Sequence, residues 1–254
     1  MSYVFNAKEA YQRIEKTWKE WASKTNAKNM VIGISGGKDS SVVAALAVKI
    51  FGKDRVIGVE MPNTRQDPIS QEVLKCLDIK SINLSIFDLV DNCARQMELN
   101  GLCPTDDSIT NLPARLRMTL LYYVAQSIGG RVINTSNLSE NMIGYSTLFG
   151  DHSGSFAPIS QLTATEVIQL GLWLGLPSEM VCKVPEDGLC GVSDEEKLGF
   201  TYSELDKYIR EDLGSDEFKN KINEIYYKNK FKMDIVRIPD VFHFLPNHIT
   251  GSLS

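Results

Sequence analysis

Short apolar runs alternate with longer amphipathic stretches along the first 134 residues of the chain. The short runs are rich in valine and isoleucine and have the length of buried β-strands. In the longer stretches apolar residues recur every three or four positions, which predicts helices with one apolar face. The strands are expected at residues 30–34, 55–60, 80–84 and 131–134, and the helices at residues 6–23 with Asn6 as the N-cap, 40–51, 68–77, 86–98 and 112–128.

Strands that alternate with helices predict an α/β fold, a doubly wound parallel sheet with helices on both faces. In such sheets ligands bind beyond the carboxyl ends of the strands, where the winding direction reverses. Two polar segments follow predicted strands in this way, one from Ser35 to Ser40 and one from Thr135 to Glu140. We therefore expect the functional site to contain both segments.

The alternation weakens after Gly150, where the remaining segments are predicted to be helices and loops. Pro185, Gly188 and Gly191 interrupt a stretch with little periodicity, which is typical of a mobile lid. We interpret residues 1–254 as a single domain. Its later parts are helices at residues 162–174, 202–210 and 218–228, a loop at 184–195 whose residues 185–195 form the lid, and a helical C-terminal extension at 200–254.

With 254 residues and 43% hydrophobic content, the chain is long and apolar enough to bury a substantial core. Its apolar runs are too short to span a bilayer, and its first residues lack the pattern of a signal peptide. The five cysteines form no Cys-x-x-Cys pair and the three histidines lack zinc-site spacing, so we expect reduced thiols in the cytoplasm. A net charge of −5 argues against nucleic acid as the main partner, and no membrane partner is expected.

The segment from Ser35 to Ser40 reads Ser-Gly-Gly-Lys-Asp-Ser and joins an apolar strand to a helix. Gly36 and Gly37 allow backbone N–H groups to surround an anion without a Cβ atom in the way. The two serine hydroxyls add donors, and a helix that begins near Ser40 directs the positive end of its dipole at the same place. The spacing differs from that of a Walker loop, but the chemistry predicts a phosphate site.

An aspartate within a phosphate loop, here Asp39, would repel the ligand unless a cation lies between them. Mg²⁺ favours one or two carboxylates together with phosphate oxygens and waters, so Asp39 is a candidate magnesium ligand. Glu140, in the second polar segment, could complete this site if the two strands are neighbours. The competing interpretation is local: Asp39 caps a helix at an ordinary turn, and Ser136 with Glu140 forms a capping pattern.

The loop resembles the pyrophosphate loop of the N-type ATP pyrophosphatases, which cleave ATP between its α and β phosphates. Further segments extend the likeness to the NAD synthetases, in that family's order, over about residues 6–210. The resemblance implies a Rossmann-like fold of the adenine nucleotide alpha-hydrolase type. It also implies the ammonia-dependent form of the enzyme, because no amidohydrolase-like region precedes the loop. The matching segments begin at Ser35, Asn111, Asn134, Gly144, Pro158, Lys183 and Ser193.

This resemblance implies a ligase that uses ATP and ammonia to amidate deamido-NAD to NAD, through a nicotinate adenylate and with release of pyrophosphate and AMP. Lys38, the loop amides and Mg²⁺ as cofactor would hold the triphosphate, which is a task of positioning and charge neutralisation. Asp151 would bind ammonium and accept its proton, although a turn aspartate beside Gly150 is an equally open interpretation. The implied catalytic residues are Lys38 and Asp151, and the implied metal ligands are Asp39 and Glu140. The implied ATP-binding residues are Gly33, Ser35, Gly36, Gly37, Lys38, Asp39, Ser40 and Thr135, and the implied deamido-NAD-binding residues are Arg115, Leu148, Asp151 and Ser155.

Four of the positions that contact ATP or deamido-NAD in the family differ here from the usual residue type. Leu148 and Ala164 stand where many relatives have lysine, Ser155 where they have aspartate, and Glu186 where they have threonine. Nucleotide affinity or the acid that is amidated could therefore differ from the family's.

Two other functions stay open at this point. An ATP pyrophosphatase that modifies tRNA calls for a cysteine pair or an RNA-binding region, and neither is evident in the sequence. A non-catalytic nucleotide sensor would not need Asp39 and Glu140, yet both are present.

The helix expected at residues 112–128 carries two apolar stripes, one more than a single-sided surface helix needs. Relatives pair through this region, so the resemblance implies a homodimer, with the forked guanidinium of Arg115 binding deamido-NAD. A helix buried within a monomer is the competing interpretation. The stripe expected to face the core consists of Leu112, Leu116, Leu120, Tyr123 and Val124, and the second consists of Met118, Leu121, Tyr122 and Ala125.

Overall fold

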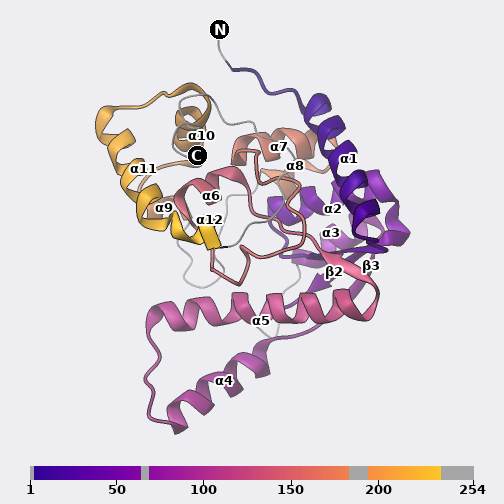
Figure 1. The fold of residues 1–254 in the computed structure, drawn as a ribbon, viewed down its shortest axis with the longest axis vertical. Coiled ribbons are helices and arrows are strands. Elements are labelled where there is room, and N and C mark those ends of the chain that lie inside the picture. The colour runs from indigo at the N-terminus through magenta and orange to yellow at the C-terminus, as the bar shows by residue number, and fades with distance from the viewer. Residues whose placement is uncertain (1–2, 64–68, 183–193, 236–254) are drawn as a thin grey trace.

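The computed structural model describes residues 3–63, 69–182 and 194–235 (Figure 1). Within them, parallel strands form one sheet in the order β3-β2-β1-β4. The chain moves outward from β1 to β3 and then returns to the other side of β1, so the winding reverses between β1 and β4. The predicted doubly wound parallel sheet is confirmed, with strand positions within two residues of those expected. The strands are β1 (Asn29–Gly33), β2 (Val56–Glu60), β3 (Lys80–Asn83) and β4 (Gly130–Val132).

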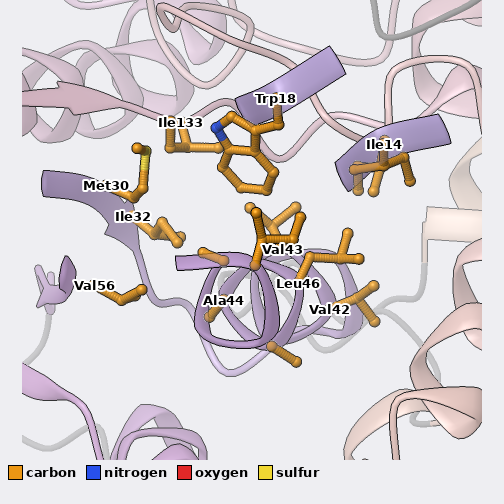
Figure 2. Close-up of a cluster of buried hydrophobic side chains, with 14 of the residues drawn as sticks. Ile14, Trp18, Met30, Ile32, Val42, Val43, Ala44, Leu46, Val56 and Ile133 are labelled. Atoms are coloured by element: carbon orange, nitrogen blue, oxygen red, sulfur yellow. The ribbon is translucent and has the colours of Figure 1, made fainter. Parts of the chain in front are cut away.

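Three helices cover one face of the sheet (Figure 1). Figure 2 shows the core between them, where Trp18 lies over a buried helix and beside Met30 and Ile32 of β1. Trp18 also stacks on Phe156, with 5.3 Å between the ring centroids. Because strand side chains alternate between faces, Val31 points to the opposite side of the sheet. The three helices are α1 (Ala7–Lys24), α2 (Lys38–Phe51) and α7 (Ala164–Trp173).

The opposite face of the sheet is covered by α5 (Asp106–Ser127). The side chains of Met118, Leu121 and Ala125 are buried against this face, whereas Tyr123 is 71% exposed. The expected assignment of the two stripes is therefore wrong for Met118, Leu121, Ala125 and Tyr123, whereas Val124 is buried against the sheet as expected. Both stripes are apolar, so hydrophobic spacing alone could not orient the helix.

The start of α5 also differs from the expectation, since the helix begins at Asp106 instead of residue 112. Thr105 and Ser108 form a reciprocal capping box, which satisfies backbone donors at this earlier position. Pro113 lies inside the helix. The preceding helix, α4 (Phe87–Leu99), contains no buried residue, and Figure 1 shows that α4 and one end of α5 project from the body of the molecule.

The C-terminal helices pack with α6 in a second hydrophobic cluster that includes Leu205, Ile209 and Ile222. The helices predicted at residues 202–210 and 218–228 are confirmed, and the part of the predicted helical extension at residues 236–254 lies outside the described residues. The other helical segments of the described residues are the 3-10 helix η1 (Lys53–Arg55), α3 (Ile69–Leu77) and α8 (Ser178–Val181). The helices around the second cluster are α6 (Leu138–Ile143), α9 (Asp194–Leu198), α10 (Tyr202–Glu211), α11 (Asp216–Asn229) and α12 (Phe231–Ile235).

The proposed lid at residues 185–195, with Glu186, falls outside the described residues except at its last two positions. Those two residues belong to α9 and not to the expected loop. Among the described residues, no helix is both long and apolar enough to cross a bilayer. The cysteines of the described part, Cys76, Cys93, Cys103 and Cys182, are free thiols.

Candidate active site

The loop after β1 is closed by its own serines. Gly36 has a φ of 80°, in the left-handed region that favours glycine. Ser35 Oγ accepts a hydrogen bond from the Gly37 N–H at 3.2 Å and lies 3.2 Å from Ser40 Oγ. Helix α2 begins at Lys38, earlier than predicted, so the first turn with its unpaired N–H groups immediately follows the glycines. The loop therefore has the donors and the helix terminus expected of a phosphate site.

The loops after β1 and β4 meet through Asp39. One oxygen of its carboxylate lies 2.7 Å from Lys38 Nζ, and the other accepts from the side-chain amide of Asn137 at 3.0 Å. Asp39 is the second residue of α2, and Gly37 is its N-cap, so the competing interpretation of Asp39 as the cap is wrong. Because β1 and β4 are neighbours in the sheet, residues almost 100 positions apart in the sequence share one site.

Glu140 belongs to this site and also caps α6. Its side chain accepts from the Asn137 N–H at 3.2 Å, while the Asn137 side chain accepts from the Glu140 N–H at 3.0 Å. The capping interpretation is thus correct for Glu140, although its partner is Asn137 and not Ser136. Burial, and then the negative charge of Asp39, raise the pKa of Glu140 to about 8.

Lys38 is the cation that these carboxylates surround. Its side chain is 7% exposed, and its Nζ lies 5.8 Å from the centroid of the Tyr202 ring. Burial alone lowers the pKa of this ammonium, but Asp39, Glu140 and Asp206 together raise it above its usual range. Lys38 is therefore held in its charged form beside the loop.

Asp151 lies on the turn that follows α6. Its side chain accepts from the Thr147 N–H at 2.8 Å, as expected of a turn aspartate, and its backbone carbonyl accepts from Asn134 at 3.0 Å. The residue has an exposed surface, yet the surrounding protein removes enough water to raise the pKa of the carboxyl. Asn134 lies two residues after the end of β4, so the turn is anchored to the same sheet edge as Glu140.

The structure brings Arg115 and Leu148 together. Arg115 Nε donates to the Leu148 carbonyl oxygen at 3.2 Å, which places this exposed arginine of α5 against the turn that carries Asp151. Ser155 lies farther along, where its N–H donates to the Val132 carbonyl at 2.8 Å. The candidate dinucleotide-binding residues therefore lie along the same turn and the adjoining edge of β4.

Two further candidates occupy the ends of the strands. Gly33 is the last residue of β1, and a Cβ added there would lie 3.3 Å from side-chain atoms of Leu121 and Met61. Thr135 is partly exposed shortly after β4. Both positions adjoin the two loops of the site, as predicted.

Ala164 lies at the start of α7, close to the buried carboxylate of Asp206. The Ala164 N–H donates to Ser139 Oγ at 2.9 Å, and that hydroxyl donates to Asp206 at 2.5 Å. Asp206 also accepts from the Thr165 N–H at 2.7 Å. Burial raises the pKa of Asp206, and the charge of its carboxylate acts on Lys38. Position 164 provides no cation here, whereas Lys38 does.

Asn137 and Asp206 both contribute to the site, although neither is among the predicted site residues. Asn137 followed by Glu140 three residues later is a capping signature that could have identified the first. Asp206 lies in α10 among residues of ordinary amphipathic spacing, so no local signal indicates that it bonds to Ser139 of α6.

Comparisons with known proteins agree on one family. Residues 10–238 match the model of the NAD synthase family. The NH(3)-dependent NAD(+) synthetase of Methanocaldococcus jannaschii is 35% identical over 255 residues, which covers 92% of this chain and 97% of that protein. That of Methanococcus aeolicus is 40% identical over 190 residues, which covers 72% and 74%. Among solved structures, NMN synthetase from Francisella tularensis has a TM-score of 0.84 at 30% identity and covers 93% of this chain and 99% of its own.

Proposed function

The chain belongs to the NAD synthase family, and we propose on this basis that it amidates deamido-NAD to NAD with ammonia and ATP. The observation that carries the proposal is the meeting of Lys38 and Asp39, from the loop after β1, with Asn137 and Glu140 from the loop after β4. A glycine-rich loop at a topological switch point is suited to a nucleotide triphosphate, and the paired carboxylates suit its metal ion.

In the first step, a carboxylate oxygen of the nicotinate group attacks the α-phosphorus of ATP. The bond from that phosphorus to the β-phosphate bridging oxygen breaks, and pyrophosphate leaves. The loop N–H groups and the Lys38 ammonium hold the triphosphate and neutralise the charge that develops on the leaving group. The product is an acyl adenylate, whose AMP is a far better leaving group than oxide.

Asp39 and Glu140 fit a magnesium ion. Burial, and then the negative charge of Asp39, raise the pKa of Glu140 to about 8, so a divalent cation held by the two carboxyl groups would stabilise the ionised form of Glu140. Within the described residues no group of three or more acidic, histidine or cysteine side chains forms a metal site, so phosphate oxygens and waters would supply the other ligands. When bound, Mg²⁺ neutralises phosphate charge during cleavage of the α–β bond.

In the second step, the nitrogen of ammonia attacks the acyl carbon of the adenylate, the bond to AMP breaks, and an amide forms. Ammonium must lose a proton before its nitrogen can attack. We propose that Asp151 binds ammonium and accepts this proton, because its raised pKa makes it a stronger base than an ordinary aspartate.

Release of pyrophosphate in the presence of ATP, Mg²⁺, deamido-NAD and ammonium chloride tests the proposal. We expect pyrophosphate, AMP and NAD in equal amounts, and no NAD when ammonium is omitted. Pyrophosphate formed when both deamido-NAD and ammonium are omitted would point to a different reaction of the nucleotide.

A second candidate substrate is nicotinic acid mononucleotide, which would give NMN. The likeness to a solved NMN synthetase favours it, as do Leu148 and Ser155 at positions where the family uses charged residues for the dinucleotide. We propose deamido-NAD as the first choice because the relatives that cover most of this chain are named NAD synthetases. The ratio of kcat/KM for the two acids decides between them, and a ratio that favours the mononucleotide would replace deamido-NAD in the proposal.

We further propose that the protein acts in the cytoplasm as a homodimer that pairs through α4 and α5. Helix α4 buries none of its residues, and Leu99 and Tyr123 are 74% and 71% exposed. A second copy of the chain would cover these apolar side chains. Since Arg115 lies on α5, the partner would stand close to the proposed dinucleotide site.

A further inference from the structure

The turn between α6 and Asp151 is held from outside by the C-terminal helices. Lys232 of α12 donates from Nζ to the carbonyl oxygens of Gly144 at 2.7 Å and Ser146 at 2.9 Å. Asn229, at the end of α11, donates to the Ile143 carbonyl at 2.9 Å. The carbonyl groups of Ile143, Gly144 and Ser146 thus accept hydrogen bonds from residues that lie more than 80 positions later in the sequence.

The next residue of the turn, Thr147, makes the direct contact with Asp151. Its N–H donates to the Asp151 carboxylate at 2.8 Å, and its hydroxyl donates to Asn111 of α5 at 2.7 Å. The Thr147 carbonyl accepts from the Gly150 N–H at 2.9 Å, which closes the turn. A shift of Gly144 and Ser146 would move the donor that orients Asp151, because the peptide group joining Ser146 to Thr147 contains both the Ser146 carbonyl and the Thr147 N–H.

We propose that Lys232 is a positioning residue for Asp151: it fixes the turn that orients the carboxylate and supplies a positive charge beside it. This inference rests on the proposed role of Asp151 as the ammonium site. Lys232 is not among the residues predicted to bind ATP or the dinucleotide, and its two carbonyl partners are both in the turn.

The charges around Asp151 support the electrostatic part of this role. Glu140 of α6 and His152 of the turn also act on Asp151, and Asp107 of α5 acts on Lys232. Burial lowers the pKa of His152, so this imidazole is neutral near pH 7. Lys232 interacts favourably with the Asp151 carboxylate, although burial lowers the pKa of its ammonium. Its removal would leave Asp151 beside Glu140 with less positive charge, which favours the protonated aspartate.

The test compares Lys232→Met with Lys228→Met, a matched change at an exposed lysine of α11. The first readout is the titration of the Asp151 carboxyl by carbon NMR, assigned with Asp151→Asn. We expect the titration midpoint of Asp151 in Lys232→Met to lie about half a pH unit or more above the midpoints in the wild-type protein and in Lys228→Met. The second readout is kinetic: the KM for ammonium should rise about tenfold in Lys232→Met, while the KM for ATP changes by less than about twofold.

Lys232→Arg should restore much of the ammonium KM, because a guanidinium can also donate to two carbonyls. Lys232→Gln keeps a donor without the charge and serves if Lys232→Met does not fold; it should show the raised midpoint. An unchanged Asp151 midpoint and ammonium KM in a folded variant would overturn the inference, as would an equal rise in both KM values. An inactive wild-type protein would instead contradict the proposed function, and the NMR titration would still decide the role of Lys232.

Discussion

The two carboxylate oxygens of Asp39 contact two partners of different kinds. Lys38 neutralises one oxygen, and the amide of Asn137 orients the other toward the loop after β4. A magnesium ion between Asp39 and Glu140 would replace the attraction that Lys38 now provides. The ammonium would then be free to turn toward the phosphates, which also carry negative charge. One lysine can thus pair with Asp39 and, with magnesium and nucleotide bound, contact the phosphates.

The first prediction at the residue scale concerns Asp39→Asn. We expect kcat to fall about a thousandfold, because a neutral amide is a poor magnesium ligand and leaves the triphosphate charge uncompensated. The fold should stay intact, since Asp39 lies partly exposed at the sheet edge. Pyrophosphate release and thermal unfolding measure the two effects. Asp54→Asn, at an exposed position of η1, is the control, and magnesium-dependent activity retained in Asp39→Asn would refute the metal assignment.

A second residue-scale prediction concerns Arg115→Lys. The substitution keeps the charge but loses the forked geometry that binds phosphate or carboxylate oxygens, so the KM for deamido-NAD should rise about tenfold. The KM for ATP should change by less than about twofold, because Arg115 contacts the Leu148 carbonyl and not the loop after β1. Steady-state kinetics with Arg13→Lys, a change at an exposed arginine of α1, as the control measures both constants. A normal dinucleotide KM would remove Arg115 from the site.

The sequence contains enough to identify Lys38, Asp39 and Glu140 as candidates, since their residue types already restrict the chemistry. It does not contain the reason that Asp39 and Glu140 meet, which is the pairing of β1 with β4. The contact of Asn137 with Asp39 and that of Asp206 with Ser139 were not predicted for the same reason. The roles of Asn137 and Asp206 come from hydrogen bonds to distant residues. The spacing of residues along the chain does not predict a partner 60 or more positions away.

At the scale of elements, a buried ion pair joins α7 to α10. Glu166 accepts from Arg210 Nε at 2.7 Å and from its terminal nitrogen at 2.6 Å, and it also accepts from the Thr163 N–H at 2.8 Å. The Tyr3 hydroxyl adds a further hydrogen bond, and burial together with the Glu166 charge raises the pKa of Tyr3. The pair therefore links the N-terminal segment with Tyr3, helix α7 and helix α10 near Asp206.

Glu166→Gln tests this connection. The amide removes the negative charge that the buried guanidinium of Arg210 contacts, and removing one partner of such a pair costs about 3–5 kcal/mol. Urea unfolding should show this loss, whereas Glu217→Gln, in the exposed first turn of α11, should change stability by less than about 0.5 kcal/mol. Equal stability of the two variants would show that the pair contributes little.

Helix α5 explains why element boundaries were harder to predict than element types. The periodic apolar residues begin near Leu112, so the pattern indicates a helix only from there. Thr105 and Ser108 extend it by satisfying the first backbone donors, and the added turn is polar and exposed. A hydrophobic pattern reports the part of a helix that is buried, and the cap decides where the helix begins.

At the scale of the whole molecule, strand order determines where the site forms. Alternating strands and helices predicted a parallel sheet, but many orders satisfy that alternation. The order β3-β2-β1-β4 makes β1 and β4 neighbours at the point where the winding reverses. The loop after β1, the carboxyl groups of Asp39 and Glu140, and the turn with Asp151 all adjoin that point. The alternation of strands and helices led to the expectation that the loops after β1 and β4 share a site, whereas the turn with Asp151 was added to that expectation by the family resemblance.

The exposed apolar side chains of α4 and α5 lead to a prediction about assembly. Ile109 and Tyr123 are 58% and 71% exposed and lie 14 residues apart on α5, which places them near one face of the helix. We expect the wild-type protein to sediment at twice the 28.4 kDa mass of the chain. The double variant Ile109→Glu, Tyr123→Glu should sediment as a monomer, because a dimer would have to bury its four added carboxylates. Its fold should be unaffected, since both side chains already contact solvent.

Kinetics then decide whether the partner matters to the site. If the second copy helps to form the dinucleotide site, the monomeric variant should show a higher KM for deamido-NAD and an ordinary KM for ATP. Leu213→Glu, at a 52% exposed position between α10 and α11, is the control for an added surface charge and should remain dimeric and active. A wild-type monomer with full activity would contradict the dimer. A dimer disrupted without any change in the dinucleotide KM would keep the assembly but show that each chain completes its own site.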